Sequence, residues 1–135
     1  MIESDNTSVR TSADSMTQSG VRAGKIVVIV PAFNEEGSIK QTIESIRGLT
    51  SDLSAMGLGL EIYIIDDGSV DRTRMIAEEA RADRILRHRV NRGLGAAVRT
   101  GMLAGRDAQA HILIKFDADQ QHDARDILDL IKPIM

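Results

Sequence analysis

Acidic side chains recur in pairs directly after short apolar runs, and they are the residues of this sequence best able to hold a cation. The pairs are Glu35 and Glu36, Asp66 and Asp67, and Asp117 and Asp119. Carboxylates that converge repel one another, so they stay ionised together only beside a cation or a set of hydrogen-bond donors. Each acid alone is equally well explained as a turn former or helix cap. For Asp66 that explanation is preferred, because only one of two adjacent acids can point at a given ligand.

The last pair has the spacing of a metal site. Asp117 and Asp119 flank the small residue Ala118, so both carboxylates can reach one divalent cation, with the amide oxygen of Gln121 as a third ligand. Mg²⁺ and Mn²⁺ prefer oxygen ligands and keep positions open for phosphate oxygens, which suits a diphosphate. The Asp-x-Asp pattern is common by chance and gains weight from its place after an apolar strand. Gln121 is equally well read as a solvated loop residue, and His122 is more often a surface group than a ligand.

Positive charge surrounds one turn between these acids. Four arginines lie near it, at Arg87, Arg89, Arg92 and Arg99. Arg92 and the backbone amides of Gly93 and Leu94, which open a helix, are candidates to bind a phosphate. Lys115 falls on a strand expected to be covered on both faces, so it must reach outward or pair with an acid.

The elements that position these residues alternate between strands and helices. Apolar, β-branched runs predict strands over 25–30, 60–65, 84–87 and 111–116, and Pro31 is expected to end the first. One apolar stripe predicts a single helix over 39–56, and Asp71 is the expected N-cap of the next. Helices between strands imply parallel pairing and a three-layer α/β fold. The carboxyl ends of parallel strands share one edge, which gathers the acids and the arginine turn.

Helical spacing also predicts which faces are buried. The third helix presents a narrow stripe formed by Leu94, Ala97, Val98, Gly101 and Met102. The last presents Ile127, Leu130, Ile131 and Ile134. Gly101 and Gly105 are small enough for the third helix to approach a strand closely.

Composition excludes several classes of protein. The chain has 135 residues, 42% of them hydrophobic, and a net charge of −3, which is one domain's worth of chain with enough apolar side chains for a core. It has no cysteine, no apolar run long enough to cross a membrane and no secretory signal, so a cytoplasmic protein is expected. The negative charge and the scarcity of aromatic residues argue against nucleic-acid binding. Residues 1–24 are polar and are expected to form a disordered tail.

Four blocks of the sequence, in order, resemble the family-2 glycosyltransferases of the GT-A fold, the Rossmann-like fold of nucleotide-diphospho-sugar transferases. The blocks are PAFNEE at 31–36, DDGSVDRT at 66–73, NRGLG at 91–95 and DADQQH at 117–122, and the likeness runs from about Lys25 to the end. The last block is most similar to that of polyprenyl- and dolichyl-phosphate sugar transferases. Gln120 stands where a small residue or leucine is more usual, and Ala124 where proline is frequent, so the loop after the metal site is expected to differ in shape.

The resemblance implies a function and a site. A family-2 enzyme transfers a sugar from a UDP- or GDP-sugar, with a divalent metal and with inversion, to an acceptor such as a polyprenyl phosphate. Pro31, Phe33 and Glu35 would border the base and ribose, and Asp67 would bind one of them. The site would comprise Pro31, Phe33, Glu35, Asp67, Arg92, Gly93, Asp117, Ala118 and Asp119. Asp117, Asp119 and Gln121 would hold Mg²⁺ or Mn²⁺, and a lipid acceptor would place a full-length parent at the cytoplasmic face of a membrane.

The short length of the chain suggests the main alternative to a complete enzyme. Members of the family continue well beyond this point, so 25–135 is expected to be the donor-binding part, with the general base beyond residue 135. The sheet edge left exposed after the fourth strand would favour self-association. The rival interpretation is a catalytically incomplete module that binds a nucleotide or metal.

Two other classes fit less well. A dinucleotide-binding dehydrogenase is suggested by the glycines at 93–95, but they follow the third strand, and Val98 occupies the third small position of that fingerprint. A phosphoacceptor receiver domain would need its first acidic pair where the turn at 31–34 stands.

Overall fold

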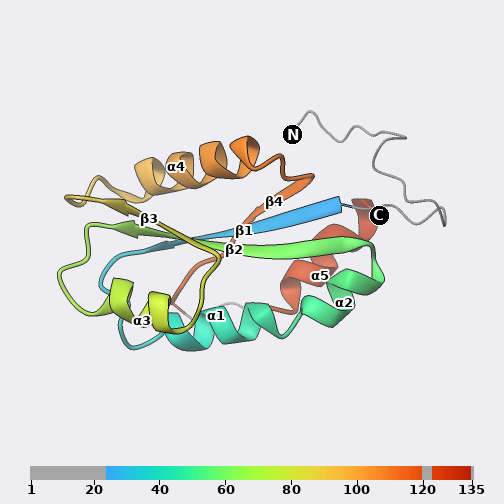
Figure 1. Cartoon of the computed structure of the whole chain (residues 1–135), viewed down its shortest axis with the longest axis horizontal. Helices are drawn as coiled ribbons and strands as arrows, with labels where there is room; N and C mark the ends of the chain where they lie inside the picture. The colour runs from blue at the N-terminus through green and yellow to red at the C-terminus, as the bar shows by residue number, and fades with distance from the viewer. Residues whose placement is uncertain (1–23, 120–122, 135) are drawn as a thin grey trace.

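A four-stranded parallel sheet forms the middle layer of the fold, with helices on both faces (Figure 1). The computed structural model describes residues 24–119 and 123–134, so the predicted polar tail lies almost wholly outside the described residues. The strands are β1 (Gly24–Ala32), β2 (Leu58–Asp67), β3 (Arg84–His88) and β4 (Ile112–Lys115), in the spatial order β3-β2-β1-β4. The predicted three-layer α/β architecture is confirmed.

Strand β1 is the centre of the core. Alternate side chains of a strand point to opposite faces, and here both faces are covered. Residues 26 to 30 of this strand are all 0% exposed. Full burial of such side chains stabilises the fold by about 1.5–3 kcal/mol each, which explains a continuous apolar run in place of an alternating one.

Pro31 does not end β1, contrary to the prediction. The strand continues to Ala32, and Pro31 pairs in register with Ile65 of β2. The carbonyl of Ile29 accepts a hydrogen bond from the N–H of Phe116, on the β4 side, and Pro31 two residues on faces the same side. The last pair between β1 and β4 joins Ile29 to Lys115. No β4 residue therefore lies opposite Pro31, and the missing N–H of proline costs no hydrogen bond between strands.

One face of the sheet is covered by α1 (Ile39–Arg47), α2 (Thr50–Ala55), α3 (Thr73–Glu79) and α5 (Asp126–Ile131) (Figure 1). The single helix predicted over 39–56 is therefore wrong in one respect, because it is two helices. The N–H of Leu49 bonds to the carbonyl of Ile46, three residues back, which tightens the chain at the junction. The predicted apolar stripe continues across the junction between the two helices, since Ile46, Leu49 and Leu53 are all buried.

Helix α4 (Leu94–Asp107) covers the opposite face, and its buried side is narrower and differently placed than predicted. The buried residues are Ala97, Gly101, Ala104 and Gly105. Leu94 and Met102, expected on that face, are 59% and 47% exposed. The predicted close approach is confirmed, because a Cβ on Gly105 would lie 2.1 Å from Cδ2 of Leu113. A helix this close to a sheet has room beneath it only for small side chains.

Helix α5 and the 3₁₀ turn Lys132–Ile134 end the described chain. Ile127, Leu128 and Ile131 are buried, whereas Leu130 and Ile134 are 63% and 62% exposed. The predicted face is therefore half wrong: the α-helix stops at Ile131, and the tighter turn carries Ile134 off the stripe. Within 24–119 and 123–134, none of the helices has the length and apolar character needed to cross a bilayer.

The order of the strands fixes where a ligand can bind. The chain moves outward from β1 to β2 to β3, then returns through α4 to place β4 on the other side of β1. In open parallel sheets, ligands bind outside the carboxyl ends of the strands where this direction reverses. The fold therefore points to the carboxyl ends of β1 and β4, with β2 beside them.

Candidate functional site

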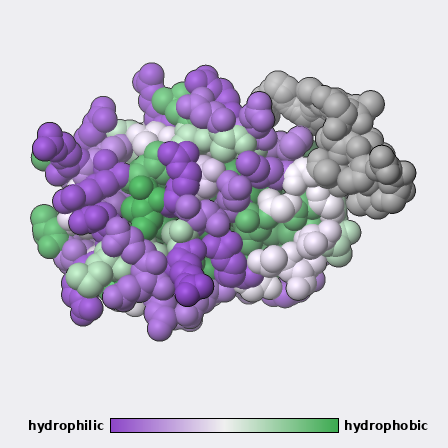
Figure 2. Space-filling model, in the orientation of Figure 1, coloured by the Kyte–Doolittle hydropathy of each residue, from purple (hydrophilic) through white to green (hydrophobic). Residues whose placement is uncertain are grey.

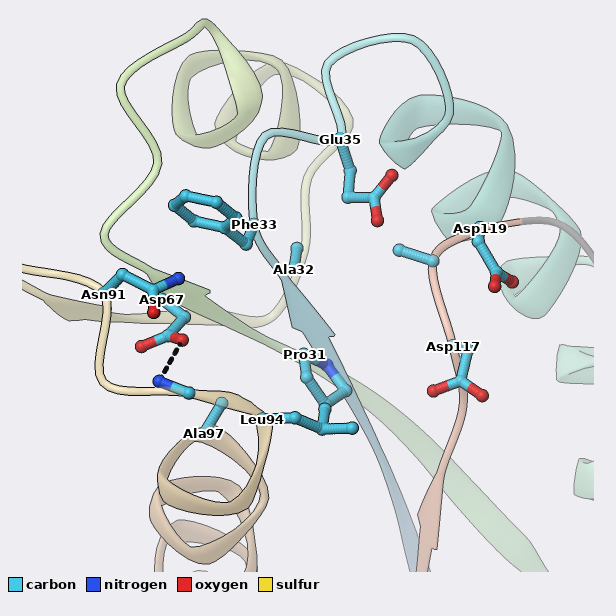
Figure 3. Close-up of a pocket in the computed structure, with 12 residues that line it drawn as sticks. Pro31, Ala32, Phe33, Glu35, Asp67, Asn91, Leu94, Ala97, Asp117 and Asp119 are labelled. Carbon is cyan, nitrogen blue, oxygen red and sulfur yellow. Dashed lines mark hydrogen bonds between the residues drawn. The ribbon is translucent and has the colours of Figure 1, made fainter.

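A pocket of about 290 Å³ lies at this place, at the carboxyl ends of β1, β2 and β4 and the first turn of α4 (Figure 3). Its lining residues are Pro31, Ala32, Phe33, Glu35, Asp67, Asn91, Gly93, Leu94, Ala97, Asp117, Ala118 and Asp119. Figure 3 shows Asp67 and Asn91 on one side, Asp117 and Asp119 on the other, and Pro31 between them. One opening thus carries carboxylates from three segments that are far apart in the sequence.

The pocket gathers the predicted binding residues with one exception. Arg92 does not line it: its side chain is exposed, and its backbone N–H bonds to Asp67. Gln121, the predicted third metal ligand, lies outside the described residues, as does His122.

Two of the six acids singled out in the sequence serve the loops and do not line the pocket. Asp66 is 1% exposed, and its Oδ1 accepts a hydrogen bond from the N–H of Ser69 at 3.0 Å, as expected of a turn former. Its Oδ2 has no hydrogen-bond partner among the described residues. Glu36 accepts a hydrogen bond from the N–H of Arg72 at 3.0 Å.

Asp67 is the most heavily bonded acid of the pocket. Its Oδ1 lies 2.7 Å from Nδ1 of His88 and accepts the N–H of Arg92 at 2.9 Å, while Oδ2 accepts the N–H of Gly93 at 2.8 Å (Figure 3). Burial alone would raise the pKa of Asp67, but the bonds from His88, Arg92 and Gly93 outweigh it and hold the pKa below its usual value. The carboxylate therefore stays ionised at neutral pH although it is only 4% exposed.

These bonds leave Asp67 a limited capacity for a ligand. A carboxylate oxygen accepts about two hydrogen bonds. Oδ1 already has two partners and Oδ2 has one, so one acceptor position remains, on the oxygen next to the Gly93 amide. Such an acceptor suits the N–H of a base or the hydroxyl of a ribose.

His88 connects the pocket to α4. Its Nε2 lies 2.8 Å from Oγ1 of Thr100, so the ring bridges Asp67 at the end of β2 to the helix. His88 is 8% exposed and is the last residue of β3. Sequence reasoning missed it, because a histidine within a weak strand gives no signal until the partner on the neighbouring strand is known.

The loop after β1 is fastened to the loop after β2 by reciprocal hydrogen bonds, here called the loop clasp. Asn34 has a positive φ of 53°, which asparagine tolerates better than most residues. Its N–H donates to Oγ of Ser69 at 2.9 Å, and its Oδ1 accepts the N–H of Val70 at 3.0 Å. The segment that carries Phe33 and Glu35 is thereby held on both sides.

Asp71 and Thr73 complete the loop clasp. The N–H of Glu35 donates to Oγ1 of Thr73 at 2.8 Å, and that of Glu36 to Oδ2 of Asp71 at 3.3 Å. Oδ1 of Asp71 accepts from both the N–H and the hydroxyl of Thr73. Burial opposes ionisation of Asp71, yet these bonds lower its pKa overall. The predicted N-cap role is shifted by one residue: the cap position is Arg72, and Asp71 bonds the first helical N–H from just before it.

The two predicted metal-ligating carboxylates flank an anchored residue. Ala118 is 2% exposed, and its carbonyl accepts hydrogen bonds from Oγ of Ser38 and, at 3.4 Å, from Oγ1 of Thr42, both at the start of α1. The methyl group of Ala118 belongs to the buried core beneath the sheet, which agrees with a small apolar residue between the two acids. Both acids line the pocket on either side of it.

Lys115 pairs with an acid, which is one of the two outcomes expected for it. Its Nζ lies 3.2 Å from Oδ1 of Asp117, and both side chains are partly exposed. Within the described part of the chain, no group of three His, Cys, Asp or Glu side chains gathers as a metal site. Asp117 and Asp119 both line the pocket and carry the oxygen atoms that divalent cations prefer as ligands.

Three lining residues were not named as candidate ligand contacts in the sequence. Asn91 stood inside the NRGLG block, and Ala32 and Ala97 were assigned only to a turn and a buried helix face. Ala32 and Asn91 lie next to predicted residues within matched blocks, which was the available signal, whereas Ala97 lies beyond the NRGLG block and gave none.

Comparison with known proteins agrees with this geometry. The family model described as "Glycosyl transferase family 2" matches residues 27–135. The UDP-N-acetylglucosamine--dolichyl-phosphate N-acetylglucosaminyltransferase of Methanococcus voltae is 32% identical over 126 residues, covering 82% of this chain and 47% of that protein. The dolichol-phosphate mannosyltransferase of Pyrococcus furiosus is also 32% identical, over 113 residues, covering 82% of this chain and 30% of that protein.

A solved structure shares the fold. Glucosyl-3-phosphoglycerate synthase from Mycobacterium tuberculosis, crystallised with Mn²⁺, UDP and glucosyl-3-phosphoglycerate, superposes with a TM-score of 0.66 and 28% identity. The match covers 82% of this chain and 39% of that one. The chain thus spans less than half the length of each of these three proteins.

Proposed function

The chain belongs to glycosyl transferase family 2, and we propose that its pocket binds the donor of a sugar transfer, a nucleotide-diphosphate sugar. Residues 25–135 then form the nucleotide-sugar-binding part of the enzyme. The observation that carries the proposal is the meeting of Asp67, held ionised beside the Gly93 amide, with Asp117 and Asp119 around one opening. An acceptor for a base or ribose and a pair of carboxylates for a cation are the two halves of a nucleotide-diphosphate site.

In this proposal the base and ribose lie against Pro31, Phe33 and Glu35, with the free acceptor position of Asp67 on an N–H or hydroxyl. Phe33 is 44% exposed at the rim, where its ring offers a face for a base. Gly93 borders this end of the pocket, but its N–H is already donated to Asp67, and Arg92 lies outside the lining, so neither supplies a contact to the diphosphate in this structure. UDP and GDP are both candidates, and UDP is favoured because it is present in the superposed structure.

Asp117, Asp119 and Gln121 are the residues proposed to hold Mg²⁺ or Mn²⁺. Both carboxylates line the pocket and can supply oxygen ligands, and Lys115, whose Nζ lies 3.2 Å from Oδ1 of Asp117, would have to turn away for a cation to bind that oxygen. When bound, a divalent ion neutralises negative charge on a departing diphosphate. Related crystal structures of glucosyl-3-phosphoglycerate synthase contain Mn²⁺ or Mg²⁺ with UDP, which supports this choice of metals.

The proposed reaction is substitution at the anomeric carbon with inversion. An acceptor oxygen forms the new bond to that carbon, the bond to the diphosphate oxygen breaks, and the nucleoside diphosphate leaves with the electron pair. The names of the two archaeal relatives point to a polyprenyl phosphate as the acceptor. Its phosphate oxygen is already ionised at neutral pH, whereas a hydroxyl acceptor would need a base to remove its proton.

The test is the unfolding temperature of the chain with UDP, GDP and their sugar conjugates, each with Mn²⁺ or with a chelator. A ligand that binds only the folded chain at 100 times its Kd adds about 2.7 kcal/mol of stability, a shift of several degrees. We expect one nucleotide to stabilise the chain, more strongly with Mn²⁺. Asp67→Asn should reduce the shift under both conditions, and Asp117→Asn/Asp119→Asn should abolish its dependence on Mn²⁺.

A matched variant controls for lost charge. Asp107→Asn/Asp129→Asn removes two carboxylates that are 72% and 77% exposed and do not line the pocket, so it should keep the full shift. A cooperative transition that no nucleotide moves would overturn the proposal. If Mn²⁺ still increased the shift in Asp117→Asn/Asp119→Asn as it does in the unaltered chain, the metal assignment alone would be overturned.

A further inference from the structure

A second hollow lies beside the β2–α3 loop, separate from the donor pocket and lined by different residues. It has a volume of about 440 Å³. Four arginines line it, at Arg72, Arg74, Arg87 and Arg89. Two of them belong to the cluster that the sequence placed around the turn at 91–93, yet none of the four lines the donor pocket. The donor site therefore leaves this positive charge unexplained.

Strand alternation explains why the arginines meet. His88 turns its ring to Asp67, on the face of the sheet that α4 covers. Arg87 precedes His88 in β3, so its side chain belongs to the opposite face, and Arg89 follows directly after the end of the strand. Helix α3 lies on that face and brings Arg72 and Arg74 at its beginning. Figure 2 shows mainly hydrophilic surface at this end of the molecule, where β2 and β3 finish, interrupted by small apolar areas.

Two loops are closely packed along the wall of the hollow. Gly68 has a φ of 80°, and a Cβ on it would lie 2.4 Å from the backbone N of Asn91 and 2.5 Å from the carbonyl C of Val90. The loops after β2 and β3 are thus in backbone contact. This contact holds the loop that leads to Arg72 and Arg74 next to the chain that carries Arg87 and Arg89.

Among the described residues, only one of the four guanidinium groups, that of Arg74, forms an ion pair with an acid. Asp71 lines the hollow, but its two oxygens already accept from Thr73 and Glu36. Glu78 pairs with Arg74 at 3.4 Å. Arg87 and Arg89 make no side-chain hydrogen bond or ion pair with any residue in the described ranges.

We propose that this arginine-lined hollow is a second binding site, for a phosphate-bearing ligand. The planar guanidinium group offers paired N–H donors that match phosphate oxygens, and several such groups around one opening favour a dianion or diphosphate over a single carboxylate. A free phosphorylated compound and a phospholipid headgroup carry the same chemistry. Val70 and Val90, which are 89% and 67% exposed beside the arginines, are available to a lipid surface. The site is independent of the proposed donor function.

The experiment titrates the 135-residue chain with two probes. Inorganic pyrophosphate, with a chelator present, tests the free source by calorimetry. Phosphatidylcholine vesicles with and without phosphatidylglycerol test the lipid source by co-sedimentation. We expect at least one probe to bind, and Arg87→Gln/Arg89→Gln to weaken its binding tenfold or more. Arg99→Gln/Arg106→Gln removes the same charge from exposed positions on α4 and should weaken it less than threefold.

The outcomes separate this site from the donor pocket. The thermal shift caused by a nucleotide with Mn²⁺ should be the same in Arg87→Gln/Arg89→Gln as in the unaltered chain. Arg72→Gln/Arg74→Gln removes the two arginines at the beginning of α3 and should also weaken binding to the hollow. It replaces Arg87→Gln/Arg89→Gln in the test if that variant does not fold. Binding of pyrophosphate would identify the ligand of the hollow as a free phosphorylated compound. Binding of vesicles that contain phosphatidylglycerol would identify it as a phospholipid headgroup. Failure of both probes, or equal losses in the hollow and control variants, would overturn the proposal whether or not the donor pocket binds its nucleotide.

Discussion

Asp67 and His88 end neighbouring strands in register, and their side chains meet at 2.7 Å on the face of the sheet that α4 covers. This contact fixes the carboxylate that accepts the amides of Arg92 and Gly93. One histidine ring thereby connects the end of β2, the turn before α4 and, through Thr100, the helix itself.

His88 is accordingly expected to position Asp67 for the donor. His88→Leu removes the bond to Asp67 and should weaken nucleotide binding tenfold or more, measured as Kd by calorimetry. Loss of one bond to a buried charged group also destabilises the fold by about 1.5–3 kcal/mol. His88→Asn places an amide N–H near the position of Nδ1 and should restore part of the affinity.

Thr100→Val separates positioning from stability. It removes only the far bond of the ring, so it should lower the free energy of unfolding and leave the nucleotide Kd within about threefold. A His88→Leu variant that folds and binds nucleotide with unchanged affinity would show that His88 has a structural role only.

Stability should decrease in acid because of Asp67 and Asp71. Both pKa values are lowered in the folded chain, below the value of about 3.9 for an unfolded aspartate. As the pH falls below about 5, the unfolded chain takes up protons before the folded one does. Their contribution is therefore complete at neutral pH and is lost as the pH falls through the lowered values.

Asp71→Asn tests this pH dependence. The free energy of unfolding, measured in urea between neutral pH and about pH 3, should fall less steeply in the variant. The same slope in the variant and the unaltered chain would contradict the assignment of Asp71.

The loop clasp should contribute to binding as well as to stability. Asn34→Ala removes the Oδ1 that accepts the N–H of Val70 and replaces a residue that tolerates a positive φ. We expect a loss of about 1–2 kcal/mol of stability and a weaker nucleotide Kd, because Phe33 is no longer held. Asn34→Gly relieves the backbone strain without restoring the bond. If both variants bound nucleotide as tightly as the parent, the clasp would have no part in the site.

The close approach of α4 to the sheet predicts opposite effects at two of its glycines. A Cβ on Gly101 would lie 3.0 Å from Cβ of Ile29 and from Cδ1 of Ile65, both buried, whereas a Cβ on Gly95 would meet nothing within 4 Å. Gly101→Ala should destabilise the chain by about 1–3 kcal/mol through overpacking. Gly95→Ala should stabilise it by about 0.5–1 kcal/mol, since alanine favours the helix. Urea denaturation measures both, and a stabilising Gly101→Ala would disprove the tight contact.

The layers, the parallel sheet and the edge that carries the pocket followed from sequence patterns alone. Two signals are local in the sequence: the run of five fully buried residues in β1, and the acids that follow β1, β2 and β4. The alternation of strands and helices is enough to infer the topology from them. The faces of the helices were predicted less well. Leu94 and Met102 are good core residues by hydropathy, but α4 lies so near Ile29 and Leu113 that only small side chains fit beneath it.

The roles of individual charged residues depended on pairing that a sequence does not display. Arg87 and Arg89 lie close to Arg92 in the sequence, yet both line the second hollow and neither lines the donor pocket. His88 acquires a role only because β2 and β3 are in register at Asp67. The contacts that decide these roles join residues more than twenty positions apart.

The loop clasp has a consequence for the thermodynamics of recognition. Fixing the backbone of one residue costs about 1–2 kcal/mol in conformational entropy. In the segment that carries Phe33 and Glu35, the hydrogen bonds that the N–H groups of Asn34 and Glu35 donate to Ser69 and Thr73 already offset that cost when the chain folds. A ligand entering there finds its wall preorganised, so its association should show a smaller entropic penalty than binding to a free loop, and little change in the backbone between the empty and the occupied state.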